Sequence, residues 1–209
     1  MIGRIIETPE DVAEGADALC RICPYLKSAY AQTGALPLRR KPDGFDQLLS
    51  AIIGQQVSIA SASAIWGRMQ DMGLTEAARI SAATEDDLRA AGLSRQKIRY
   101  ARALAAAEID YDALRIAPDD EVIRTLTAVS GIGPWTAEVY AMFSLGRADV
   151  FAPGDLALQE AARVLYGLPE RPKERAFRTM AEAWAPWRSV AARLLWAYYR
   201  VDKKREGIR

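Results

Sequence analysis

The chain has 209 residues, half of them hydrophobic, so it can bury a substantial core and is not a disordered chain. That length suits one domain or two small ones that share an interface. A formal net charge of +1 excludes a histone-like polycation. No apolar run reaches the ~18 residues of a membrane span, and the first ten residues lack the basic and apolar segments of a signal peptide. We therefore expect a soluble protein that is not exported and does not contact a membrane.

The chain has no histidine and two cysteines, which restricts its chemistry. Without histidine there are no His-based triads, no His-ligated metals and no usual general base. Cys20 and Cys23 form one C-x-x-C, too few thiols for a four-cysteine zinc or iron–sulfur site. The pair lies on an alanine-rich stretch that we expect to be helical and to end at Pro24, without the βαβ setting of a redox motif. We interpret it as structural, with a redox role as the alternative.

Helical patterns recur along the chain, whereas no sustained strand-like alternation occurs. Apolar residues at three- and four-residue spacing predict a helix over 45–53, with Asp43 as its N-cap. A second helix is expected to begin after Ser58, another capping residue, and to stop at Gly73.

Capping signals mark the helices that follow. Thr84 begins a sequence that resembles a capping box and opens a helix that Gly92 stops. Ser94 then caps a helix over 95–107. Further helices are predicted over 119–128, 134–143, 156–165, 173–184 and 187–201. The resulting fold class is all-α, with many short helices joined by turns of ordinary length.

Charge is distributed unevenly along the chain. Residues 171–209 hold 11 Lys and Arg against 4 Asp and Glu, while residues 1–170 hold 17 against 23. A basic C-terminal section on a nearly neutral protein suits an anionic partner that meets one face. The alternative is a solvated tail, because Lys203, Lys204 and Arg205 lie close to the terminus.

The most informative stretch is 126–137, which reads LTAVSGIGPWTA. A predicted helix ends here, a Gly-x-Gly turn follows at Gly131 and Gly133, and Pro134 stands where a first helical residue needs no amide. The glycines permit positive φ and a close approach of a ligand to the main chain. The amides that open the next helix would then face an anion such as a nucleic-acid phosphate. The alternative is an ordinary pair of helices joined by a glycine turn.

Five runs together resemble the alkylation-repair branch of the helix-hairpin-helix DNA glycosylases, the 3-methyladenine DNA glycosylase II type. They occur in the family's order and are 50–58 (SAIIGQQVS), 91–97 (AGLSRQK), 126–137, 150–158 (VFAPGDLAL) and 184–189 (WAPWRS). The resemblance implies two helical subdomains, 44–147 with the hairpin and 1–43 plus 148–209, with an active-site cleft between them. It also implies excision of alkylated purines from double-stranded DNA in base excision repair, by a monomer in the simplest case. The expected place of action is the bacterial cytoplasm and nucleoid, or a eukaryotic nucleus.

Asp155 matches the family's catalytic aspartate, twenty residues after Trp135. Cleavage of an N-glycosidic bond develops positive charge on the sugar, which a fixed carboxylate stabilises while water attacks. Alkylated purines of this class already carry positive charge and leave without an acid, so one carboxylate and no histidine suffice. Asp155 also reads as the N-cap of the helix that follows it, and the two roles are compatible.

Trp135 stands where lyases of the superfamily carry a Schiff-base lysine, so the resemblance implies an enzyme without lyase activity. Trp135 and Trp196, the counterpart of a pocket tryptophan, are expected to stack on the extruded cationic base. Gln56 matches the residue that fills the gap in the base stack, and a helix-capping role is its alternative.

The remaining site residues belong to the hairpin. Gly131, Gly133 and Thr136 are expected to contact the DNA backbone. The carbonyls of Thr127, Ser130 and Ile132 match those that hold a monovalent cation in some relatives, and no other cofactor is expected. Two other functions stay open: a hairpin module that binds DNA without catalysis, and an oxidised-base glycosylase/lyase.

Overall fold

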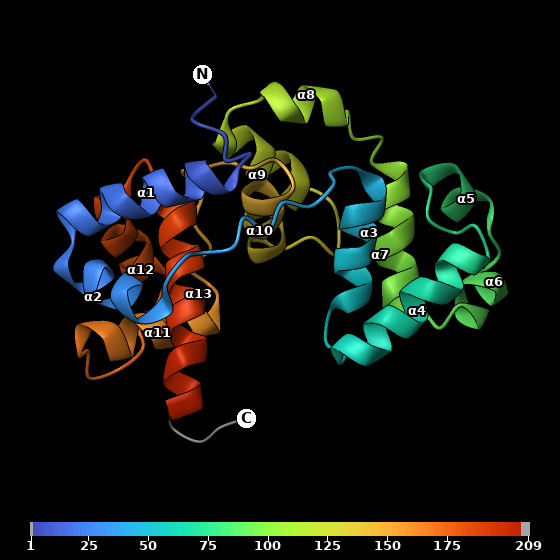
Figure 1. Ribbon diagram of the computed structural model, residues 1–209. Helices are drawn as coiled ribbons and strands as arrows, with labels where there is room; N and C mark the ends of the chain where they lie inside the picture. Colours follow the sequence, from blue (N-terminus) through green and yellow to red (C-terminus); the bar gives the residue numbers. More distant parts are fainter. Residues whose placement is uncertain (1, 206–209) are drawn as a thin grey trace. The chain divides into compact units, whose positions relative to one another are not determined.

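The computed structural model describes residues 2–205, and within them it confirms the all-α fold (Figure 1). This part of the chain contains no strand, only an isolated bridge between Ile5 and Arg147. Its helices are α1 (Pro9–Ile22), α2 (Pro24–Thr33), α3 (Phe45–Gly54), α4 (Ile59–Asp71), α5 (Ala77–Ala82), α6 (Glu85–Ala90), α7 (Arg95–Ala106), α8 (Tyr111–Ile116), α9 (Asp119–Thr127), α10 (Pro134–Phe143), α11 (Leu156–Tyr166), α12 (Glu174–Ala181), the 3₁₀ helix η1 (Glu182–Trp184) and α13 (Arg188–Arg205).

The chain divides into two compact units. One unit is Lys41–Tyr140, and the other combines Met1–Arg40 with Ala141–Arg209. We call them the hairpin unit and the terminal unit. The predicted division had its boundaries at 44 and 147, a few residues later than those of the structure. None of the helices within residues 2–205 has both the length and the apolar character that crossing a membrane requires.

The hairpin unit is built around α3, which packs against α4 and α7. The apolar face of α3 is buried as its spacing predicts, with Leu48, Leu49, Ile52 and Ile53 at most 1% exposed. This face explains why a ten-residue helix is stable here, because packing supplies what intrinsic propensity does not.

Local capping chemistry sets several helix starts in this unit. The side chains of Ser58 and Ser94 accept hydrogen bonds from the third residue of α4 and of α7, as predicted. Thr84 and Asp87 form the expected capping box at the start of α6. The expected Asp43 cap of α3 is wrong: Gly44 occupies the N-cap position, and Asp43 instead pairs with Arg115.

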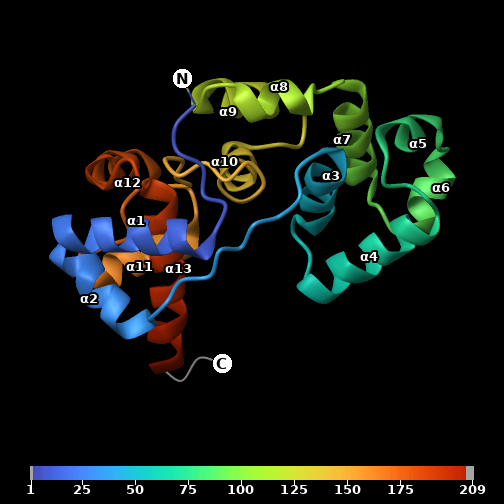
Figure 2. The same cartoon turned by 45° about the horizontal axis from the view of Figure 1, so that its top comes forward.

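The terminal unit is organised around α13, which packs against α1, α2 and α11. Figure 1 and Figure 2 both show α13 with these three helices gathered beside it. An edge-to-face cluster of Phe151, Phe177 and Trp184 adds to this core. The helix predicted over 173–184 stops at Ala181, and its last turn tightens into the 3₁₀ helix η1.

The two cysteines lie where α1 gives way to α2. The helix α1 ends at Ile22, just before Pro24, as expected. Pro24 is then the first residue of α2, a position at which proline needs no amide. Cys23 is the residue between the two helices, and its Sγ lies 3.2 Å from the Tyr166 hydroxyl. Both thiols are free and half-buried. These contacts favour a structural role for the pair.

Candidate active site and nucleic-acid interface

The turn between α9 and α10 is held by hydrogen bonds from Val129 N to Leu126 O and from Ile132 N to Val129 O. Gly131 has φ +98°, and a side chain added there would collide with the ring of Tyr100 from α7. Only glycine fits this position without strain. At Gly133 φ is not positive, and no atom lies within 4 Å of an added Cβ. The fold therefore requires the first glycine and leaves open space at the second.

The N-terminus of α10 follows directly. Pro134 is its first residue, and the hydrogen-bond ladder begins with Ala137 N donating to Gly133 O at 3.1 Å. Thr136 as a whole is only 7% exposed, so its hydroxyl offers little surface to an approaching anion. Trp135 is 46% exposed beside it, an unusual exposure for so large an apolar side chain.

The predicted cation site lies in the same turn. The hydroxyl of Thr127 donates to the carbonyl of Ile123 at 2.7 Å, which fixes the end of α9. The hydrogen bonds of the turn use the carbonyls of Leu126 and Val129 rather than those of Thr127, Ser130 and Ile132. Within residues 2–205 no three metal-ligating side chains come together, so a cation here would depend on these carbonyls, and it stays a prediction.

Gln55 and Gln56 follow α3 and behave differently. Gln56 has φ +56° and an exposed side chain. Gln55 donates through Nε2 to Gly131 O at 2.9 Å, which ties the end of α3 to the hairpin. Sequence reasoning missed this contact because its partners are 76 residues apart and neither residue type indicates it.

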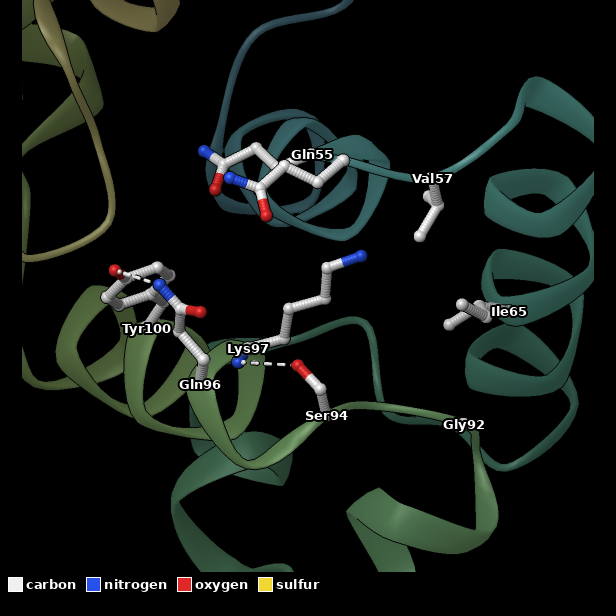
Figure 3. Close-up of a pocket in the computed structure, with 9 residues that line it drawn as sticks. Gln55, Val57, Ile65, Gly92, Ser94, Gln96, Lys97 and Tyr100 are labelled. Atoms are coloured by element: carbon white, nitrogen blue, oxygen red, sulfur yellow. Dashed lines mark hydrogen bonds between the residues drawn. The ribbon is translucent and has the colours of Figure 1, made fainter.

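A pocket of about 260 Å³ opens beside the two glutamines (Figure 3). Its polar lining includes Ser94, Gln96 and Lys97 at the start of α7. Lys97 donates from Nζ to Ile53 O at 2.6 Å, and burial lowers the pKa of its ammonium group. Because that bond satisfies a carbonyl near the end of α3, Lys97 supports the segment that carries Gln56.

In the terminal unit, Asp155 is the N-cap of α11, as predicted. Its Oδ1 accepts hydrogen bonds from Ala157 N at 2.9 Å and Leu158 N at 3.0 Å. The loop before it is fixed by Gln159, whose Nε2 donates to Pro153 O at 2.8 Å. The carboxylate is half-buried and held in one place by the helix start.

Trp196 of α13 adds a third donor, its Nε1, 3.2 Å from the same oxygen of Asp155. Its ring lies 5.7 Å from that of Phe143, tilted by 34°. The structure thus brings two of the predicted site residues together, although they are 41 positions apart. The contact was not foreseen, because the sequence indicated an aromatic face for the base and not a hydrogen bond to the carboxylate.

A family model described as "HhH-GPD superfamily base excision DNA repair protein" matches residues 49–187. The chain belongs to this superfamily. The match covers the hairpin and Asp155 together and confirms the resemblance identified from the five sequence runs.

Individual HhH-GPD relatives support the alkylation-repair branch. DNA-3-methyladenine glycosylase 1 from Schizosaccharomyces pombe is 31% identical over 166 residues, which are 75% of this chain and 72% of that protein. The structure of the Schizosaccharomyces pombe enzyme Mag1 in complex with abasic DNA gives a TM-score of 0.76 at 28% identity, covering 88% of this chain and 95% of that one. The structure of a DNA-3-methyladenine glycosidase from Bacillus halodurans gives a TM-score of 0.75 at 36% identity, covering 92% of this chain and 90% of that one. The chain spans 64% and 39% of two longer curated relatives.

Proposed function

We propose that the protein is a monofunctional DNA glycosylase that removes alkylated purines of the 3-methyladenine and 7-methylguanine type and leaves an abasic site. The named activity of its HhH-GPD relatives supports this reaction, and so does the abasic DNA bound in the Mag1 complex. The partner is damaged double-stranded DNA. No cofactor is required for the reaction, and the carbonyls of the hairpin are a candidate site for a monovalent cation.

The observation that carries the proposal is the fixed carboxylate of Asp155. Two main-chain amides and the Trp196 indole hold Oδ1 in place. In the proposed reaction the bond between the sugar C1′ and the base nitrogen breaks, and its electron pair neutralises the cationic base. The carboxylate stabilises the positive charge that remains on the sugar, and water adds to C1′ and loses a proton.

The remaining site residues have supporting roles. The half-exposed indole of Trp135 is suited to stack on an extruded cationic base, a contact of roughly 0.5–2 kcal/mol. Gln56 fills the space that the extruded nucleotide leaves in the duplex. The amides at Gly133 and Thr136 bind a DNA phosphate at the start of α10. An indole rather than an amine at Trp135 gives no nucleophile for a Schiff base, so no strand cleavage is expected.

The test incubates the purified full chain with DNA methylated by an alkylating agent. We expect free 3-methyladenine or 7-methylguanine in the supernatant, and strand breaks only after alkali treatment. Borohydride added during the reaction should trap no covalent protein–DNA adduct. Binding without base release would instead support a hairpin module that does not catalyse, and a trapped adduct would support the oxidised-base glycosylase/lyase alternative.

A further inference from the structure

Arginines gather on the terminal unit around α13, outside the site described above. Arg193 is 1% exposed and donates from both Nε and Nη2 to Leu38 O at 3.3 Å. Arg40 donates from Nη1 to Ser144 O at 2.6 Å. These bonds fix the chain on both sides of Arg39, which is itself exposed.

Arg193 holds Leu38, the residue before Arg39, against α13, and Arg200 lies about two turns further along that helix. Burial, followed by the charges of Arg39 and Arg40, lowers the pKa of Arg193 to about 10. Desolvation, followed by the charge of Arg200, lowers the pKa of Arg39. Arg39, Arg193 and Arg200 form no ion pair with the residues that the structure describes. Mutual repulsion without a carboxylate partner is the environment that an incoming anion relieves.

The backbone at Arg39 provides a second, independent observation. Its φ is +53°, in the left-handed region that side chains rarely adopt. Hydrogen bonds hold the residues on both sides, Leu38 and Arg40, while Arg39 between them is exposed. Backbone strain of this kind is concentrated at binding and catalytic positions.

The register of α13 links this cluster to the candidate active site. Arg193, Trp196 and Arg200 are separated by three and four residues, so they lie along one face of the helix. Trp196 hydrogen-bonds Asp155, and Arg200 follows one turn later, ~6 Å along the axis. That step is comparable to one or two nucleotides of a DNA strand at roughly 3.4 Å each.

We propose that Arg39 and Arg200 together bind a phosphate of the DNA strand whose nucleotide is presented to Asp155. Guanidinium groups suit this task because their paired N–H groups match two phosphate oxygens. The inference rests on the proposed function, since it takes DNA as the ligand. It assigns strand binding to the terminal unit in addition to the hairpin.

The test measures binding of the full chain to a duplex with a tetrahydrofuran abasic analogue, from 50 to 200 mM salt. Arg39→Gln and Arg200→Gln should each weaken binding about tenfold. Each should also reduce the slope of log affinity against log salt by about one. Arg21→Gln is the control, because Arg21 is an exposed arginine in the last turn of α1. This change removes the same charge and should leave the affinity and the salt slope unchanged.

A second variant separates binding from folding. Arg39→Gly removes the guanidinium and suits φ +53°, so it should weaken binding about tenfold while its melting temperature stays at or above that of the wild type.

Wild-type salt slopes in Arg39→Gln and Arg200→Gln would overturn the proposal, as would an equal loss in Arg21→Gln. Release of methylated base by the wild-type protein tests the proposed function separately. If the wild-type protein binds the duplex but releases no base, the proposed function is contradicted. The salt slopes of the arginine variants then still test the phosphate site. A wild type that does not bind DNA overturns both.

Discussion

Replacing Asp155 by asparagine removes a charge while keeping a cap. Asparagine ranks with aspartate at N-cap positions, and its side-chain oxygen can still accept from Ala157 N, Leu158 N and Trp196 Nε1. We therefore expect the free energy of unfolding to change by less than about 0.5 kcal/mol. The rate of base release should fall by about 10²–10³-fold, because about 3–4 kcal/mol of charge stabilisation on the sugar is lost.

Two further variants isolate the contribution of the cap. Asp155→Ala also removes the acceptor for three donors, so it should lose about 1–2 kcal/mol of stability in addition to its activity. Asp110→Asn makes the same chemical change at the N-cap of α8, where Asp110 Oδ1 accepts from Ala113 N at 2.9 Å. It should alter neither stability nor activity.

Single-turnover release of methylated base and urea unfolding are the two assays. If Asp155→Asn released base at the wild-type rate, this carboxylate would not be the catalytic group. If Asp155→Asn were destabilised as much as Asp155→Ala, the argument that separates charge from capping would fail.

Three other expectations follow from the same geometry. Gly131→Ala forces a side chain against Tyr100 at positive φ and should lose about 2–4 kcal/mol of stability in urea unfolding. Gly133→Ala should keep the wild-type stability but bind DNA more weakly. Equal stabilities of the two variants would contradict this reasoning. Hydrogen bonds from Arg163 and Arg171 lower the pKa of Glu160 from 4.5 to about 2. The ionised carboxylate therefore contributes fully to the stability of the fold above pH 4.5, and this contribution is lost as the pH falls toward 2. Glu160→Gln should accordingly lose about 1–3 kcal/mol at pH 7 and flatten the stability–pH curve in that window, and a parallel curve would refute the assignment. Gln56→Ala should weaken binding to lesion-containing duplex more than it slows excision from single strands, and equal losses on both would argue against its role in filling the base stack.

Local signals predicted much of the fold. Ser58, Thr84 and Ser94 cap helices as expected because capping needs only residues three apart in sequence. Helices α2, α5 and α8 were not predicted. In α5 and α8, six residues are too few to show a helical period. Asp43 was misassigned because Arg115, 72 positions away, competes for its carboxylate.

The candidate site shows the same limit. The position of Asp155 at a helix start followed from its neighbours in sequence, and the structure has it there. Its contact with Trp196 and the bond from Gln55 to Gly131 join segments that are distant in sequence. Such contacts depend on how helices pack, which capping rules and glycine patterns do not encode. The same holds for the ring of Tyr100, which leaves no room for a side chain at Gly131, the hairpin glycine with positive φ.

Gly131 packs against the ring of Tyr100, and Gln55 donates a hydrogen bond to the carbonyl of Gly131. These two contacts have a consequence for association with DNA. These contacts within the protein hold the loop, so we expect it to lose little conformational freedom when it binds DNA. We therefore expect changes at Gln55 or Tyr100 to weaken DNA binding even though they leave the residues of the hairpin itself unaltered.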